Sequence, residues 1–369
     1  MSLQQGTSPT AATATSQSFV NRTPVYYGWI ILVVATIAAI MTSPGQTFAV
    51  SIFLERFISE LGISRSLVST LYTIGTLVGS FALPLVGRQF DQRGARTTMT
   101  VIAILFGLAC LYMGFVQNAL MLGIGFCLIR MLGQGSLSMV STNLINQWWV
   151  RHRGPILGLS GTMMALIGVG GAPNLINWLI PQFGWRTTYM LLGAGLLLFL
   201  APLAWLLVRN RPEDHGLLPD GAPSLQARPG QATGLGAHPV PVAEENWTRA
   251  EAIRTPIFWI FLLGLASVSM LGTGLMFHIV SIFADNNMSP ALAATAYVPL
   301  AFVTAATNLG SGFIVDRVRL RVLMALSLLL QTLWLWMVTY LSNWWLAMVF
   351  GVVLGATSGL QRTVSTVAW

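Results

Sequence analysis

Apolar stretches separated by short polar turns recur along the chain from Tyr26 to its end. A helix of roughly 20 residues crosses the hydrocarbon core of a bilayer, which is about 30 Å thick. Lipid offers the backbone no hydrogen-bond partners, so such stretches are helices unless they alternate as barrel strands do, and these do not alternate. We predict ten membrane-spanning helices, at residues 25–50, 66–86, 98–117, 119–145, 154–181, 185–208, 256–284, 291–314, 321–341 and 344–368.

Two polar segments interrupt this pattern. Residues 1–23 are rich in Ser, Thr, Ala and Gln and lack the apolar core of a signal peptide, so we expect a disordered tail there. Residues 209–254 have the composition of a flexible linker, with a short surface helix near Trp247–Arg254. The predicted organisation is a tail (1–23), an N-terminal six-helix bundle (24–208), a linker (209–254) and an incomplete C-terminal bundle of four helices (255–369).

Composition excludes a water-soluble protein. Hydrophobic residues make up 54% of the 369 residues and charged residues 8%. Soluble domains carry roughly 25% charged residues, so this chain could not build a surface that faces water on all sides. The predicted fold class is an all-α membrane protein.

The basic residues set the orientation in the membrane. All 19 are Arg, and they gather in alternate loops, which is the positive-inside pattern and not a basic face for nucleic acid. The loops after the even-numbered spans hold Arg88, Arg93, Arg96, Arg151, Arg153, Arg209, Arg211, Arg317, Arg319 and Arg321. The opposite loops hold Arg56, Arg65 and Arg186. We therefore expect a multi-pass protein of the plasma (inner) membrane with a cytoplasmic N-terminus and linker, and no nucleic-acid partner.

Two similar loops follow the second and the eighth predicted spans. The first is Gly87-Arg88-Gln89-Phe90-Asp91-Gln92-Arg93-Gly94-Ala95-Arg96, and the second is Gly312-Phe313-Ile314-Val315-Asp316-Arg317. Internal repeats of this kind are common in transporters, which bind substrate between the repeats. The candidate gating and structural residues are Gly87, Asp91, Arg93, Gly94, Arg96, Gly312, Asp316 and Arg317.

These loops resemble the signature loop of the major facilitator superfamily, and Arg130-Met131-Leu132-Gly133-Gln134-Gly135 is similar to its second motif. Further motifs look like the branch of oxalate/formate antiporters and monocarboxylate transporters. These are Tyr26-Tyr27-Gly28-Trp29, Gly184-Trp185-Arg186, Arg211-Pro212-Glu213-Asp214-His215-Gly216 and Pro219-Asp220-Gly221. The resemblance implies a two-bundle secondary transporter that works as a monomer.

The family has twelve spans, and about ten are predicted here. The register of Trp148 with Trp369 between the halves suggests that the chain is truncated at its C-terminal end. The resemblance also implies that Asp91 faces the start of an eleventh span.

No arrangement of residues typical of an enzyme is found. The sequence lacks a P-loop, a Cys/His metal spacing and a Ser/His/Asp set, so we expect neither catalysis nor a cofactor or bound metal. Cys110 and Cys127 fall inside apolar stretches and are expected to be unpaired.

Two arginines lie inside predicted spans, where a charge costs about 2.5–3.5 kcal/mol and needs a cavity or a partner. Arg130, in the fourth span, is either a structural arginine bonded within its bundle or a residue that binds substrate or couples its transport to an ion. Arg362, beside Gln361 in the tenth span, either reaches toward the membrane surface or binds an anionic substrate. The second role rests on the resemblance, which implies that spans one, four, seven and ten line the central cavity.

The remaining candidates are polar groups without charge. His278 in the seventh span is either a hydrogen-bonded core histidine or a residue for ligand binding or proton coupling. Gln46, Asn143, Asn146 and Asn308 could bond either a substrate or another helix. The eighth span lacks the basic residue that the resemblance implies for dicarboxylate carriers, which leaves monocarboxylates and uncharged substrates.

The predicted function is secondary active transport of a small organic anion, in particular a monocarboxylate, by alternating access. The alternatives are efflux of amphipathic or apolar compounds, and a truncated chain that does not transport or acts as a sensor. The predicted partners are the lipid bilayer and the small-molecule substrate.

Overall fold

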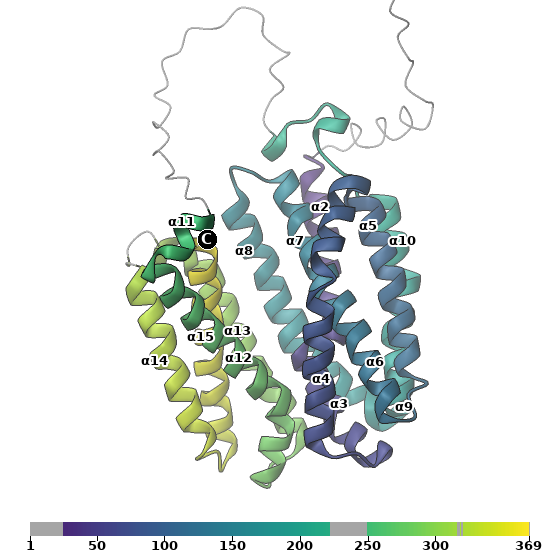
Figure 1. The fold of residues 1–369 in the computed structure, drawn as a ribbon, viewed down its shortest axis with the longest axis vertical. Helices are drawn as coiled ribbons and strands as arrows, with labels where there is room; N and C mark the ends of the chain where they lie inside the picture. The colour runs from purple at the N-terminus through teal and green to yellow at the C-terminus, as the bar shows by residue number, and fades with distance from the viewer. Residues whose placement is uncertain (1–24, 222–248, 316–317, 319, 369) are drawn as a thin grey trace, which may run out of the picture.

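The computed structural model describes residues 25–221 and 249–368, except 316, 317 and 319, and these residues form helices joined by short turns (Figure 1). The elements α2–α10, here called the N-terminal half, are α2 (Gly28–Ile40), η1 (Ser43–Gly45), α3 (Thr47–Leu61), α4 (Arg65–Ser80), α5 (Leu83–Met113), α6 (Ala119–Ile129), η2 (Arg130–Leu137), α7 (Ser138–Trp148), α8 (Arg153–Met163), η3 (Met164–Gly171), α9 (Ala172–Gly195), η4 (Leu196–Leu200) and α10 (Ala201–Leu207). The linker contributes η5 (Glu213–His215), η6 (Pro219–Gly221) and α11 (Arg249–Arg254). The C-terminal half consists of α12 (Pro256–Asp285), α13 (Pro290–Val315), α14 (Leu320–Val338) and α15 (Trp344–Ala368).

Eight helical segments of the described chain are long and apolar enough to cross a membrane. Two of them, with 49 and 55 residues, are more than twice the length that one crossing needs. Each of these two bends at a glycine whose backbone is left-handed, Gly94 (φ 79°) in α5 and Gly184 (φ 75°) in α9. Each therefore makes two crossings, and the described segments together make about ten, in agreement with the sequence.

The first crossing differs from the uninterrupted helix predicted over residues 25–50. The helix stops at Ile40, passes through the short turn η1 and resumes as α3, which continues to Leu61. Pro44 lacks the N–H that a regular helix would use at this point. Gly45 packs directly against the backbone carbonyl of Ile129, where a side chain would not fit. The interruption therefore allows a close approach between the first and fourth crossings.

The molecule has two ends, where the turns between the crossings lie. At one end, here called the Tyr26 end, the hydroxyls of Tyr26 and Tyr27 each donate to a backbone carbonyl, Trp148 O and Leu207 O, over 2.8 Å. The start of the first crossing and the ends of the fourth and sixth crossings therefore meet there. The opposite end, here called the Asp285 end, holds the α3–α4 turn and the α12–α13 turn (Figure 1).

An aromatic cluster fills the N-terminal half near the Asp285 end. The rings of Phe53 and Tyr189 lie 4.2 Å apart, and the edge of Trp185 meets Phe57 at 5.0 Å. All four side chains are fully or almost fully buried. Rings packed in this way contribute beyond the apolar area that they bury, so they hold α3 and α9 in fixed positions.

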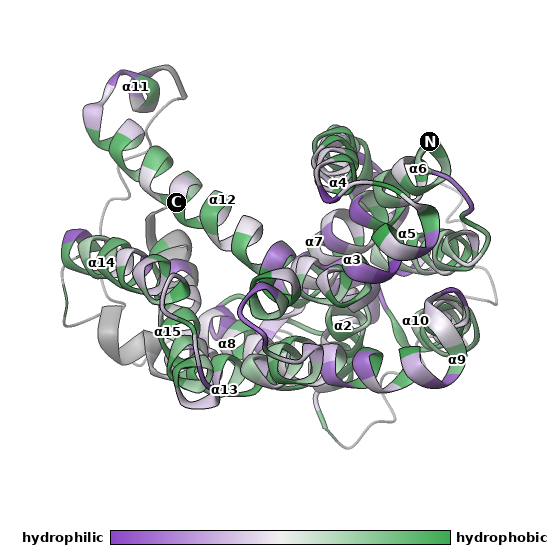
Figure 2. Cartoon of the chain, turned by 90° about the horizontal axis from the view of Figure 1, so that it is seen from below, coloured by the Kyte–Doolittle hydropathy of each residue, from purple (hydrophilic) through white to green (hydrophobic). Residues whose placement is uncertain are grey.

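The outward faces are apolar. Figure 2 shows hydrophobic residues along most of the length of the helices. Large apolar side chains point outward, for example Leu120 and Leu198, which are 73% and 79% exposed. A surface of this kind would be unstable in water and is matched by lipid, so the described helices form a multi-pass membrane protein.

Candidate functional site

Arg130 lies at the start of η2, where the fourth crossing widens into a π-helical segment. Its side chain is 4% exposed. Nε donates to the Thr76 hydroxyl at 2.9 Å, and Nη1 donates to Gly45 O at 3.1 Å and to the Thr47 hydroxyl at 3.3 Å. The guanidinium also lies 4.7 Å from the centre of the Tyr72 ring. These partners all belong to the N-terminal half.

This arrangement corresponds to the structural alternative for Arg130. A buried charge is tolerated when it is hydrogen-bonded and paired with a polarisable group, and here carbonyl, hydroxyl and ring supply this. Gln46 lies in the same region and donates to the Thr42 hydroxyl at 3.0 Å and weakly to the Ser138 hydroxyl at 3.4 Å. Both side chains thus join helices within one half.

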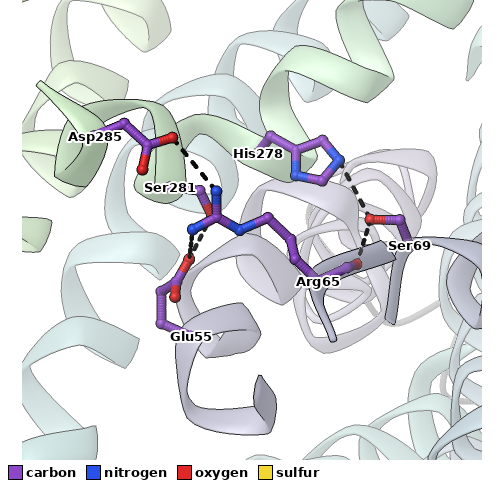
Figure 3. A network of polar contacts seen from close by, with 6 residues as sticks. All are labelled: Glu55, Arg65, Ser69, His278, Ser281 and Asp285. Carbon is purple, nitrogen blue, oxygen red and sulfur yellow. Dashed lines mark hydrogen bonds and ion pairs between the residues drawn. The ribbon is translucent and has the colours of Figure 1, made fainter. Parts of the chain in front are cut away.

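A network of charged and polar groups connects the two halves at the Asp285 end (Figure 3). Arg65, at the start of α4, donates to Glu55 of α3 at 3.2 Å and to Asp285 of α12 at 3.4 Å. The hydroxyl of Ser281 in α12 donates to the same oxygen of Glu55. Arg65 therefore lies between two carboxylates, one from each half.

His278 belongs to this network. Its Nε2 lies 3.3 Å from the hydroxyl of Ser69, one turn further along α4 (Figure 3). Ser69 donates to the carbonyl of Arg65, so its oxygen is free to accept from the imidazole. The structure thus places His278 at a contact between the halves.

Further contacts between the halves lie deeper in the molecule. The Tyr72 and Phe277 rings are 4.3 Å apart, so the ring that covers Arg130 also touches α12. The hydroxyls of Ser51 and Tyr297 approach to 3.4 Å. The side-chain amide of Asn174 donates to the carbonyl of Ala294 at 3.2 Å.

Beyond the network, α12 and α13 follow different paths relative to the N-terminal half. α12 lies beside α3 and α4 at the Asp285 end and runs away from α4 toward the Tyr26 end (Figures 1 and 2). α13 instead stays close to the fifth crossing: Gly158 lies against the backbone of Asn308, and Gly170 lies against Ala301.

The other predicted candidates are dispersed. Gln361 of α15 donates to the Ser269 hydroxyl of α12 at 2.6 Å, within the C-terminal half. The side chain of its neighbour Arg362 lies outside the described residues.

Asn143 and Asn146 are half-buried on α7, whereas Asn308 is buried on α13. None of these residues contacts Arg130 through a hydrogen bond that the structure describes.

The first of the two similar loops, residues 87–96 and here called the first signature loop, packs against the sixth crossing. Arg96 donates to Trp205 O at 2.6 Å and lies 4.2 Å over the Trp205 ring, and its backbone N–H donates to the side chain of Asn210. That Asn210 side chain fills the space beside Gly94. Asp91 and Arg93 are exposed, and Asp91 makes no hydrogen bond or ion pair in the part of the chain that the structure describes.

The remaining motif residues carry less information. Gly87 has open space beside it in α5. In the second signature loop, Gly312 lies within α13, while Asp316 and Arg317 fall outside the described residues.

Several residues of the network were not predicted from the sequence. Arg65 was noted only as one of the few arginines in the opposite loops, and Glu55, Asp285 and Asn174 were not singled out. The available signal was that opposite charges lie in two loops predicted on the same side of the membrane. Their pairing depends on how the halves pack.

A family model described as the Major Facilitator Superfamily matches residues 32–368. Among curated proteins, the multidrug resistance protein B homolog of Mycobacterium tuberculosis is 29% identical over 182 residues, or 48% of this chain and 33% of that protein. The gallate transporter of Pseudomonas putida is 28% identical over 221 residues, or 59% and 45% respectively. The probable sulfoacetate transporter SauU of Cupriavidus necator is 24% identical over 170 residues, or 42% and 36%. The chain therefore spans less than half the length of these relatives.

Among solved structures, a bacterial homologue of the human lysosomal transporter Spinster, in an inward-facing and unoccupied conformation, matches with a TM-score of 0.63. The two sequences are 18% identical, and the match covers 92% of this chain and 75% of that one. The occupied form of the same homologue matches with a TM-score of 0.59. At this identity the likeness concerns the fold.

Proposed function

The chain belongs to the major facilitator superfamily, and from this premise we propose that it is a secondary transporter that moves a small organic anion, in particular a monocarboxylate, by alternating access. In this mechanism the two halves rock around a site between them and open it to one side of the membrane at a time. The observation that carries the proposal is the Arg65–Glu55–Asp285 network, which joins the halves at one end.

The Tyr26 end is proposed to face the cytoplasm of a plasma membrane. The Arg-rich loops after the second, fourth and sixth crossings lie at this end, which favours that orientation by the positive-inside rule. The network at the Asp285 end is then an outer gate in its closed state. The inward-facing conformation of the Spinster homologue, which shares the fold, supports this assignment.

The network has properties that suit a gate. Its Arg65, Glu55 and Asp285 side chains are 40%, 37% and 64% exposed, and ion pairs at such positions contribute about 0–1 kcal/mol each. A few weak contacts of this kind hold a closed state that thermal motion can still open. A buried ion pair would be much harder to separate.

Two observations support an organic anion as substrate. Relatives include transporters named for gallate and for sulfoacetate, which are both organic anions. Arg130 is occupied by partners of its own half, so Arg362 in the tenth crossing is the candidate that remains for an anion. A guanidinium can bind a carboxylate through two parallel hydrogen bonds.

The experiment that tests this role is uptake of a labelled monocarboxylate into vesicles. We expect saturable uptake that related unlabelled acids compete away, and we expect Arg362→Gln to abolish it while membrane insertion persists. Arg254→Gln, which removes an exposed charge of α11, is the matched control and should transport normally. Uptake at the normal rate by Arg362→Gln would exclude the binding role.

A second candidate is export of amphipathic or apolar compounds. The relative named multidrug resistance protein B homolog favours it. The same vesicles decide between the two: extrusion of a lipophilic cationic dye that excess organic acids do not inhibit would support export and contradict anion transport.

The transporter is proposed to act as a monomer in the bilayer. Each proposed component, the gate and the substrate site, is built from one chain. No partner other than lipid and substrate is needed for the mechanism.

A further inference from the structure

Asp220 lies in the linker, yet its carboxylate binds a turn of the N-terminal half. Oδ2 accepts from the backbone N–H of Val150 at 3.1 Å and of Arg151 at 2.7 Å, and Oδ1 accepts from the N–H of His152 at 3.0 Å. The His152 ring nitrogen Nδ1 lies 3.2 Å from the same Oδ1. Three consecutive amides of the α7–α8 turn are thus held by one side chain.

The backbone around Asp220 is shaped for this contact. Asp220 itself has a left-handed backbone (φ 61°), which is uncommon for a residue with a side chain, and Gly221 follows with φ 67°. The Tyr26 ring packs against Gly221, while the Tyr26 hydroxyl donates to Trp148 O. The contacts around Asp220 and Gly221 therefore offset the strain in the backbone there. Strained residues of this kind cluster at functional sites.

The turn held by Asp220 begins a helix of the N-terminal half that also packs against the C-terminal half. This helix, residues 153–183 and here called the crossing helix, comprises α8, η3 and the first part of α9. Along its length Gly158 meets the backbone of Asn308, Gly170 meets Ala301, and Asn174 donates to Ala294 O. Its contacts with α13 would allow it to follow the C-terminal half when the halves move apart.

We propose that Asp220 ties the crossing helix to the rest of the N-terminal half, so that this helix moves with that half when the two halves rock. The inference rests on the proposed transport function. Asp220 is a positioning residue: it contacts no substrate, and it acts by fixing the start of the crossing helix. The Pro219-Asp220-Gly221 motif thereby gains a role, and the start of the linker becomes part of the moving unit.

The charge of Asp220 strengthens the tie. A carboxylate near the first turn of a helix interacts favourably with the helix dipole and with the free N–H groups there. Arg151 and His152 add basic side chains beside it. Neutralising Asp220 should therefore weaken the tie even when the hydrogen-bond geometry is retained.

The first test measures hydrogen exchange in the protein reconstituted in nanodiscs. In Asp220→Ala the amides of residues 150–152 should exchange about tenfold faster or more, since hydrogen bonds to a charged acceptor are lost. Asp220→Asn should fall between this variant and the unaltered protein. Asp214→Ala removes an exposed carboxylate from the same segment and serves as the matched control, with unchanged exchange. Unchanged exchange in Asp220→Ala would overturn the proposal.

The second test follows the crossing helix itself. Spin labels at Arg88→Cys and Gly154→Cys, two exposed positions of the N-terminal half, should give one narrow distance distribution. Asp220→Ala should broaden this distribution, and the maximal uptake rate should fall several-fold at an unchanged half-saturation concentration. A narrow distribution, or faster exchange with a normal uptake rate, would show that Asp220 merely caps the turn. If the unaltered protein takes up no substrate, the proposed function fails, while the label distances still decide whether the tie exists.

Discussion

At the scale of single residues, Arg130 shows how the N-terminal half accommodates a buried charge. Its donors reach a backbone carbonyl and two hydroxyls, and Tyr72 covers the guanidinium. Replacing Arg130 by Met would leave the Gly45 carbonyl without this partner in a dry environment.

We expect Arg130→Met to lower the free energy of unfolding by about 1–3 kcal/mol, the cost of an unsatisfied buried polar group. Thermal unfolding in detergent measures this, with Arg254→Met at an exposed site as the control. Normal stability combined with lost substrate uptake would contradict the structural role and restore the substrate-binding alternative.

Asp220 gives a pH prediction. Partial burial raises the pKa of this carboxyl, but hydrogen bonds from the amides of Arg151, His152 and Val150 and from the His152 ring outweigh burial and lower it below its usual range. A carboxylate whose pKa is depressed in the folded protein stabilises it above the unfolded-state pKa, and loses this contribution as the pH falls through the folded value.

The label pair at residues 88 and 154 should therefore keep its narrow distance from pH 8 to pH 5 and broaden only below about pH 4, the ordinary range of Asp. Asp220→Asn removes the titrating group and should show no such acid transition. Broadening above pH 5 in the unaltered protein would contradict this assignment.

The sequence pointed to some of these residues but not to their partners. Arg130 and His278 stand out because polar groups inside apolar stretches are costly, and this holds for any fold. Arg65 and Asp285 are 220 residues apart, and each is unremarkable in its own loop. Their pairing follows from the packing of two halves, about which local patterns carry no information.

At the scale of the elements, glycines set the bends between crossings. Gly94 has a left-handed backbone, and the Asn210 side chain occupies the space where a Cβ would lie. Gly87, seven residues earlier in α5, has no neighbour within 4 Å of that position.

We expect Gly94→Ala to lower stability by about 1–3 kcal/mol because alanine is strained in the left-handed region. Gly87→Ala is the matched control and should be neutral or slightly stabilising, since alanine favours the helix. Equal unfolding temperatures for the two variants would contradict the role of Gly94 in the bend.

The length of the apolar stretches predicted the crossings well. The turns at Gly94 and Gly184 lie where polar residues separate predicted spans. The break at η1 was missed although Ser43-Pro44-Gly45 is a turn signal, because the apolar residues on both sides of it were joined into one predicted span. Pro44 was thus a local signal for the break, whereas the close contact of Gly45 with Ile129 is a tertiary feature. The short surface helix expected near residues 247–254 is described over Arg249–Arg254.

At the scale of the whole molecule, the class of fold follows from composition and periodicity, while the relative placement of the halves does not. Apolar helices face lipid on most sides, so their outer surfaces place few constraints on which helix meets which. The contacts that decide the arrangement join distant parts of the sequence: the polar network of Figure 3, the Tyr72–Phe277 ring pair, and the packing of α13 against α8, η3 and α9.

In the proposed mechanism the two halves separate at the Asp285 end during each transport cycle. Ser69 of α4 and Ser281 of α12 lie on opposite halves within the network, and cysteine replaces serine at little cost in volume. Both can be changed to Cys in a chain whose native Cys110 and Cys127 are replaced by Ala.

The decisive measurement is uptake of a labelled monocarboxylate by this double-cysteine variant before and after bridging with a short, reducible bis-thiol reagent. We expect bridging to stop uptake and reduction to restore it, while the same reagent leaves Ser69→Cys and Ser281→Cys active as single variants. Undiminished uptake by the bridged protein would contradict this mechanism.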